Sequence, residues 1–164
     1  MEHFDCVGCD ASPHAIGEAR RILHPRESLL VASLDTLSLR RRFDVVCAFD
    51  VAEHVPDLSA VFESAGRLLN PGGLLVFTVP VYDGPLGWLV HRLDKDPTHV
   101  HKRGRDFWLG QLEPRFELLR YTGVWRYFLP GGVYLNVMSR LSRRVTTAVL
   151  VVARARGGAA AAAA

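Results

Sequence analysis

The stretch from Phe43 to Tyr82 constrains the fold of this chain more than any other part of the sequence. It opens with a short apolar run, Phe43–Phe49, whose composition is typical of a parallel strand covered on both faces. From Leu58 onward, apolar residues recur in steps of three and four, which is the pattern of a helix with one buried stripe. A second apolar run, Leu74–Val81, follows. A strand, a helix and a strand of these lengths predict a right-handed parallel crossover.

Both ends of the predicted helix carry capping signals. Asp57 is a suitable N-cap, because its carboxylate can accept from a free backbone N–H of the first turn. The Asn-Pro-Gly-Gly segment at 70–73 is expected to end the helix and form a turn. Asn tolerates the left-handed cap position, proline cannot continue a helix, and glycines suit a turn.

Polar residues gather where these two predicted strands end. Asp50, Glu53 and His54 follow the first strand, and Tyr82 and Asp83 follow the second. Ligands of parallel α/β sheets bind beyond the carboxyl ends of the strands. The sequence therefore predicts a binding site at this edge of the sheet.

Further elements are predicted on either side of this unit. Before it we expect strands at Phe4–Cys9 and Leu29–Leu34, with a helix that opens at Ser12-Pro13. After it the expected helical segments and strands are, in chain order, helices at Trp88–Leu93 and Arg105–Gln111, a strand at Phe116–Trp125, a helical turn or two at Tyr134–Leu141, and a strand at Thr146–Ala153.

These features together resemble a known family. The pattern FDVV-x4-VxEHVPD, followed by a helix and by RLLNPGGLLVFTVP, resembles the class I S-adenosylmethionine-dependent methyltransferases, in particular the branch with the ubiquinone-biosynthesis methyltransferases. The match spans roughly Phe4 to Ala155. The resemblance implies an α/β Rossmann-like sheet, mostly parallel with an antiparallel final hairpin. It also implies S-adenosyl-L-methionine as cofactor and methyl transfer to oxygen or carbon of a small-molecule acceptor.

The resemblance also defines the expected domain. Residues 1–156 would form one methyltransferase domain with a substrate lid at about 82–105, and residues 157–164 a low-complexity tail. The family's first strand and its glycine-rich cofactor loop have no counterpart here. The strands at Phe4–Cys9 and Phe43–Phe49 would both pair with that first strand, so we expect them either to stand apart or to pair directly. We also expect weak cofactor binding or none.

Three strand ends are the expected cofactor contacts under this resemblance. They supply three residue pairs: Asp10 and Ala11, Asp35 and Thr36, Asp50 and Val51. In the family, the acid at the position of Asp10 accepts from the ribose hydroxyls, and the acid at the position of Asp35 contacts the adenine amino group. An ionised carboxylate suits such donors because it only accepts hydrogen bonds. Alternatively, both acids are simple strand-end turn residues.

Methyl transfer to a hydroxyl requires a group that takes the acceptor's proton. His54, His99 and His101 are the catalytic candidates, because imidazole titrates near neutral pH. His54 follows a strand end at the expected cleft. The alternative is that His54 only braces its loop through hydrogen bonds.

A divalent cation is the second option for activating a hydroxyl. Asp50, Glu53 and His54 are spaced i, i+3, i+4, and the resemblance adds a later histidine, His99 or His101, as a further ligand. Two carboxylates and imidazoles suit Mg²⁺, Mn²⁺ or Zn²⁺. Many family members with the same Glu-His pair use no metal, so the sequence favours a site without one.

Composition excludes several other classes. A formal charge of +3, with short arginine clusters that lack interleaved aromatic residues, does not predict a nucleic-acid partner. No apolar run is long enough to span a membrane and no signal peptide opens the chain, so we expect a cytoplasmic protein. Cys6-x-x-Cys9 lacks the second cysteine pair of a zinc site, and Cys47 is expected in the core.

Two other functions remain open. The chain could be a non-catalytic methyltransferase-like remnant or partner-binding domain, which the missing glycine loop favours. A nucleotide-binding oxidoreductase would use a similar sheet, but the sequence has no G-x-G-x-x-G fingerprint. Titration with S-adenosylhomocysteine and with NAD would separate the three.

Overall fold

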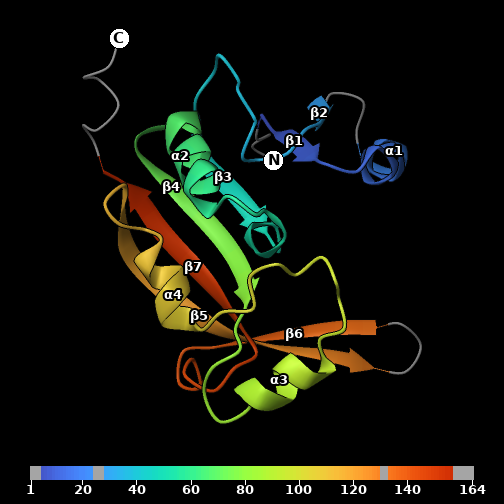
Figure 1. Ribbon diagram of the computed structural model, residues 1–164. Coiled ribbons are helices and arrows are strands. Elements are labelled where there is room, and N and C mark those ends of the chain that lie inside the picture. The colour runs from blue at the N-terminus through green and yellow to red at the C-terminus, as the bar shows by residue number, and fades with distance from the viewer. Residues whose placement is uncertain (1–4, 24–27, 130–132, 157–164) are drawn as a thin grey trace.

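The computed structural model describes residues 5–23, 28–129 and 133–156 of the chain. Most of these residues belong to a five-stranded sheet with helices beside it, and a small two-stranded sheet lies next to them (Figure 1). The predicted tail at 157–164 and the first residue of the predicted opening strand, Phe4, lie outside the described residues.

The large sheet has the strand order β3-β4-β7-β5-β6. Its strands are β3 (Phe43–Phe49), β4 (Leu69–Pro80), β5 (Phe116–Leu129), β6 (Val133–Ser139) and β7 (Ala148–Ala155). The β3–β4 pair is parallel, as the crossover predicts, and β4–β7, β7–β5 and β5–β6 are antiparallel. The sheet therefore combines a parallel part with an antiparallel C-terminal part, which confirms the α/β fold class.

Helix α2 (Leu58–Leu68) connects the two parallel strands and covers one face of the sheet (Figure 1). Asp57 caps it as predicted, since its Oδ1 accepts from the backbone N–H of Ala60 at 3.0 Å. Phe62 on its buried stripe meets the ring of Phe77 edge-on at 5.7 Å and that of Phe116 at 6.4 Å. These rings join the helix to strands on both sides of β7, so this is the centre of the hydrophobic core.

Two sequence predictions about element boundaries are wrong. The segment at 134–141 was expected to be helical, but β6 pairs with β5 from Val133 to Ser139, a long-range partner that a local pattern does not reveal. The segment at 70–73 follows the end of the helix, and Gly72 has a positive φ of 77°, but the strand expected to begin at Leu74 already begins at Leu69 and includes this segment. Helix α2 ends at Leu68, and Leu69 already pairs with Phe43. The next pairing is Val45 with Leu74, so residues 70–73 form a bulge.

The second sheet consists of β1 (Val7–Asp10) and β2 (Ser28–Val31), which pair in parallel. Helix α1 (Pro13–Ile22) follows β1 and has Ser12 as its N-cap, with Oγ accepting from the backbone of Ala15 at 3.2 Å. Among the described residues β1 pairs only with β2, and β3 only with β4. Of the two predicted arrangements, direct pairing of β1 with β3 is therefore wrong.

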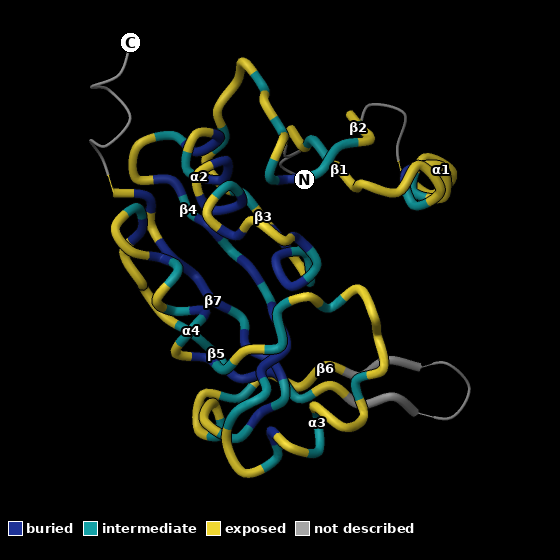
Figure 2. Tube along the Cα trace, viewed as in Figure 1, coloured by how far each residue is buried: buried dark blue, intermediate teal, exposed yellow. Residues whose placement is uncertain are grey.

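The unpaired edge changes the environment of β3. Its sequence is that of a buried strand, yet Val45 is 47% exposed and Phe49 is 56% exposed. Cys47, expected in the core, is also exposed and is a free thiol. Figure 2 shows the contrast between the partly exposed β3 and the buried middle of β4 and β7. The reason is that β3 has a neighbouring strand on one side only within the described chain.

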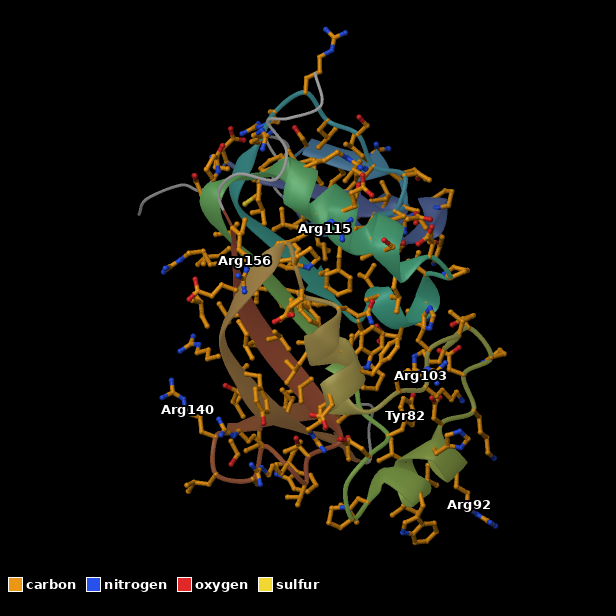
Figure 3. The ribbon with its side chains drawn as sticks, turned by 60° about the vertical axis from the view of Figure 1, so that its left-hand side comes forward. Tyr82, Arg92, Arg103, Arg115, Arg140 and Arg156 are labelled. Carbon is orange, nitrogen blue, oxygen red and sulfur yellow. The ribbon has the colours of Figure 1, made fainter. Side chains whose placement is uncertain are left out.

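Residues 82–105, called the lid segment below, leave the end of β4 and return to helix α4 (Arg105–Gly110). The segment contains helix α3 (Gly87–Leu93) and a loop at 94–104, in agreement with the sequence. Its two ends lie side by side, because the backbone N–H of Tyr82 donates to the carbonyl of Arg103 at 3.1 Å (Figure 3). The segment is thereby closed onto the carboxyl end of β4.

Candidate active site

A single turn of 3₁₀ helix, Ala52–His54, follows β3 and carries the first functional side chains. Asp50 precedes it with a positive φ of 53°, a backbone conformation that residues other than glycine rarely adopt. Its Oδ1 accepts from Thr78 at 3.0 Å and from the Arg126 guanidinium at 2.5 Å. The strained turn at the end of β3 is therefore held by contacts to two other strands.

The strained turn places Glu53 inside the protein. Glu53 is 1% exposed, and neither of its carboxylate oxygens has a hydrogen-bond partner in the described part of the chain. Burial raises the pKa of this carboxyl from 4.5 to about 7. A buried carboxylate without a partner is costly, so Glu53 is prepared for a proton or a cation.

His54 and His99 meet Glu53 from two different segments. Glu53 and His54 come from the turn after β3, and His99 comes from the lid segment. One ligand atom from each of the three lies within 4.8 Å of the other two, and the two imidazole rings are 4.7 Å apart between centroids. We call Glu53, His54 and His99 the active-site cluster.

Hydrogen bonds from the lid segment hold this cluster. The backbone N–H groups of Val100 and His101 donate to the carbonyl of Glu53 at 3.0 and 3.2 Å. Nδ1 of His54 lies 2.9 Å from the Thr98 hydroxyl. Nδ1 of His99 lies 2.8 Å from Oδ2 of Asp94. The loop between α3 and α4 therefore forms one wall of the site.

Asp94 is the most connected carboxylate of the lid segment. It accepts from the Tyr82 hydroxyl, from His99 and, at 3.2 Å, from Nζ of Lys102. Partial burial alone would raise the pKa of Asp94, but the hydrogen bonds from Tyr82 and His99 outweigh it and hold that pKa well below the usual range. Burial and the same contact with Asp94 raise the pKa of Tyr82. At neutral pH the pair is a carboxylate and a neutral phenol.

His101, the third predicted catalytic histidine, lies outside the cluster. Its Nε2 lies 3.0 Å from the carbonyl of Val55 and 3.2 Å from that of Pro56. Its ring stacks on Phe107 and meets Trp108 edge-on. These contacts fasten the lid segment to the turn after β3, so the structure brings together two of the three predicted histidines.

Two of the four expected cofactor residues of the small sheet, Asp10 and Ala11, lie at the end of β1. The other two, Asp35 and Thr36, lie in a turn at 34–36, because β2 ends at Val31 and not at Leu34 as expected. Asp10 is exposed, and its Oδ1 accepts from the backbone N–H of Ser12 at 2.7 Å, while Ala11 beside it is exposed too. In the turn after β2, Thr36 donates its hydroxyl to the carbonyl of Ser33. Oδ1 of Asp35 is buried and has no partner among the described residues.

Asp50 and Val51 lie at the end of β3, between the small sheet and the active-site cluster in chain order. Asp50 is already engaged by Arg126 and Thr78, and Val51 is half-buried at the start of the 3₁₀ turn. The predicted metal set is thus only partly assembled: Glu53, His54 and His99 converge, whereas Asp50 does not join them.

A divalent cation fits the chemistry of the active-site cluster. Its members offer one carboxylate and two imidazoles, a donor set that suits Mn²⁺ or Zn²⁺. Both carboxylate oxygens of Glu53 lack a hydrogen-bond partner among the described residues, and a cation would supply the missing charge partner. The cluster fits a transferable proton as well.

Sequence reasoning missed Asp94, Lys102 and Arg126. Asp94 could have been noticed, because it is an acid a few residues before His99 in the segment that was expected to form the substrate lid. Arg126 gave no such signal, since it pairs with Asp50 across 76 positions of the chain.

Comparisons with known proteins agree with this architecture. The model of a family described as a methyltransferase domain matches residues 2–143. A ubiquinone biosynthesis O-methyltransferase of Cereibacter sphaeroides is 41% identical over 78 residues, which is 44% of this chain and 31% of the relative. The corresponding enzyme of Methylococcus capsulatus is 35% identical over 81 residues, 45% of this chain and 33% of the relative. The matched region thus spans about a third of the length of these relatives.

Solved structures show the same fold. A S-adenosylmethionine-dependent methyltransferase of Thermotoga maritima has a TM-score of 0.68 at 16% identity, covering 90% of this chain and 72% of that one. The N-methyltransferase NodS of Bradyrhizobium japonicum, solved with S-adenosyl-L-homocysteine, has a TM-score of 0.59 at 15% identity, covering 93% of this chain and 66% of that one.

Among the described residues, no helix has the length and apolar character needed to cross a membrane. From the family match and the fold together, the chain belongs to the methyltransferase domain family and has the class I S-adenosylmethionine-dependent methyltransferase fold.

Proposed function

We propose that this chain takes part in methyl transfer from S-adenosyl-L-methionine to a hydroxyl group of a small molecule. The observation that carries the proposal is the convergence of Glu53, His54 and His99 beyond the end of β3. Polar groups able to bind a cation or take a proton meet there, where ligands of such sheets bind. The names of the curated relatives, O-methyltransferases of ubiquinone biosynthesis, favour oxygen over carbon as the acceptor atom.

Asp10 and Asp35 would hold the cofactor. The exposed Asp10 carboxylate can accept from the ribose hydroxyls, and the unpartnered buried Oδ1 of Asp35 suits an amino-group donor. Ala11, Thr36, Asp50 and Val51 would contribute the neighbouring surface. When bound, the cofactor supplies a methyl group on a positively charged sulfur, and the protein's task is mainly to align the acceptor oxygen with it.

The active-site cluster would activate the acceptor. His54 and His99 can take the hydroxyl proton, and Glu53 can balance the resulting positive charge. If the cluster holds a divalent cation, the same three residues are its ligands and the cation lowers the pKa of a bound hydroxyl. The expectation of a site without metal stays a prediction, and the buried, unpartnered Glu53 favours the cation. His101 is proposed to serve as a structural brace.

A non-catalytic, methyltransferase-like binding domain is the second candidate. The observation in its favour is that β1 and β3 each have one edge without a partner strand in the described chain. No strand followed by a glycine-rich turn lies between them there. This candidate predicts no methyl transfer, even where the cofactor binds.

The test is calorimetric titration with S-adenosylhomocysteine and with NAD, followed by a radiolabelled methyl-transfer assay on simple catechols and phenols. The proposal expects binding of S-adenosylhomocysteine but not NAD, and labelled methyl ether that disappears in His99→Ala. The matched control is His14→Ala, which removes an exposed histidine of α1 and should leave the product unchanged. Cofactor binding without any product would favour the binding-domain candidate, and NAD binding would refute both.

A further inference from the structure

The loop that follows α3 in the lid segment carries two carboxylates, and each is linked to one imidazole of the active-site cluster. Asp94, with its side chain 11% exposed, lies 2.8 Å from Nδ1 of His99. Asp96 accepts from the Thr98 hydroxyl at 2.6 Å, and the same hydroxyl lies 2.9 Å from Nδ1 of His54. Each of the two histidines is therefore contacted at its own Nδ1.

The proton positions on His99 follow from counting donors. The Tyr82 hydroxyl has one proton and donates it to Asp94. Nδ1 of His99 then faces two oxygens, Oδ2 of Asp94 at 2.8 Å and the Tyr82 oxygen at 3.2 Å. An ionised carboxylate has no proton to give, so a hydrogen bond at this distance requires Nδ1 to be the donor. The lone pair of the neutral ring consequently lies on Nε2.

The same count applies to His54. The Thr98 hydroxyl donates its single proton to Oδ1 of Asp96. It can therefore only accept from His54, and the carbonyl of Thr98, 3.3 Å from the same nitrogen, also only accepts. Nδ1 of His54 must carry the proton, and Nε2 again keeps the lone pair.

We propose that the loop from Asp94 to His99 positions both imidazoles of the active-site cluster. Asp94 acts directly on His99, and Asp96 acts on His54 through Thr98. The inference rests on the proposed function for what the two Nε2 lone pairs do, namely bind a cation or take a proton. The tautomers themselves are a separate statement about these hydrogen bonds.

Asp94 and Asp96 are not interchangeable in this scheme. Nε2 of His99 lies 3.8 Å from Oδ2 of Asp96, which is too long for a hydrogen bond, and the Asp96 side chain is 45% exposed. Asp94 is further fixed by Lys102 and by the backbone N–H of Asp96, which donates to its Oδ1 at 3.0 Å. Each carboxylate therefore serves one histidine, and the two links can be broken independently.

The first test reads the tautomers directly in the full chain. Ring nitrogen shifts from proton–nitrogen correlation spectra distinguish a protonated nitrogen from one with a lone pair, and His54→Ala and His99→Ala assign the signals. At pH 8 both rings should carry the proton on Nδ1. Asp94→Ala should release His99 into a mixture of tautomers and leave His54 unchanged. Thr98→Val, similar in shape but without a hydroxyl, should do the reverse.

The second test measures cation affinity by titration with Mn²⁺. Loss of a group that orients a histidine ligand lowers affinity about 10–100-fold, so we expect this for both Asp94→Ala and Thr98→Val. Asp94→Leu is close in size but has no acceptor oxygen, and it provides the measurement if Asp94→Ala does not fold. Asp106→Ala, which removes an exposed acid of α4, is the charge-matched control and should bind as the unsubstituted chain does.

The outcomes separate the inference from the proposed function. If the tautomers respond as described but the chain binds no Mn²⁺, the positioning inference stands and the cation is excluded from the proposed function. If Asp94→Ala, or Asp94→Leu in its place, and Thr98→Val leave both the tautomers and the Mn²⁺ affinity unchanged, the inference is overturned while the proposed function remains open.

Discussion

Replacing Glu53 with glutamine should change how the stability of the protein depends on pH. Glu53 is 1% exposed and unpartnered, and burial raises its pKa from 4.5 to about 7. Each pKa unit corresponds to about 1.4 kcal/mol, so ionised Glu53 destabilises the folded protein by about 3 kcal/mol. Glutamine has nearly the same shape and carries no charge, so the Glu53→Gln variant avoids this cost at every pH.

The sign follows from proton binding. Between pH 4.5 and about 7 the folded protein keeps the proton on Glu53, whereas the unfolded chain has already released it. The folded state binds more protons in this window, so the contribution of Glu53 to the free energy of unfolding falls as pH rises. Below pH 4.5 the contribution is complete, and above pH 7 it has been lost. Glu53→Gln should therefore be more stabilising at pH 8 than at pH 5.

Urea unfolding at pH 5 and pH 8, with chelator present, measures this difference. We expect the difference in unfolding free energy between Glu53→Gln and the unsubstituted chain to grow by about 2–3 kcal/mol over this range. Glu63→Gln is the matched control, because Glu63 lies on the surface of α2 in an ion pair with Arg67. Equal pH profiles for the Glu53→Gln variant and the unsubstituted chain would refute the reasoning. Added Mn²⁺ should flatten the profile of the unsubstituted chain if it binds there.

Three further substitutions test other parts of the structure. Asp10→Ala should weaken S-adenosylhomocysteine binding by about 1–3 kcal/mol, and an unchanged dissociation constant in calorimetry would remove Asp10 from the site. Arg105→Met should cost about 2–3 kcal/mol in urea unfolding, because buried Arg105 donates to Asp83 and to the carbonyl of Thr146; no loss would contradict that role. Phe62→Ala should cost about 3–5 kcal/mol, and a loss under 1 kcal/mol would mean that this core contact is absent.

The unit from β3 to β4 could be predicted from the sequence because its signals are local. The apolar run at Phe43–Phe49 became a strand with the same bounds, and the stripe that begins at Leu58 became a helix capped by Asp57. Strand β6 was missed because its pairing with β5 depends on the distant pairing of β5 with β7. The class of the fold, set by the parallel crossover, did not depend on that strand.

The candidate site was predictable in part for the same reason. Glu53 and His54 follow a strand end, which is a local signal, and His99 was one of two candidates in the lid segment. Choosing between His99 and His101 required the hydrogen bonds that direct His101 to the carbonyls of Val55 and Pro56. The ion pair between Asp50 and Arg126 joins β3 to β5, two strands that are not neighbours in the sheet, and no sequence period encodes it.

The topology divides the proposed function between two separately hydrogen-bonded sheets. The cofactor candidates Asp10 and Asp35 follow the two strands of the small sheet, whereas the active-site cluster follows β3 of the large sheet. No strand pair joins the two sheets in the described chain. The exposed ion pair of Arg41 with Asp5 links the segment before β3 to the segment before β1. Exposed pairs of this kind contribute about 1 kcal/mol or less. Under the proposed function, cofactor affinity should therefore depend on how firmly the small sheet is held, while cation affinity and the histidine tautomers should depend on the lid segment. A chain that binds the cofactor weakly but keeps its cation affinity and its histidine tautomers would have its defect at the unpaired edges of β1 and β3. The chemistry of the active-site cluster would then be intact.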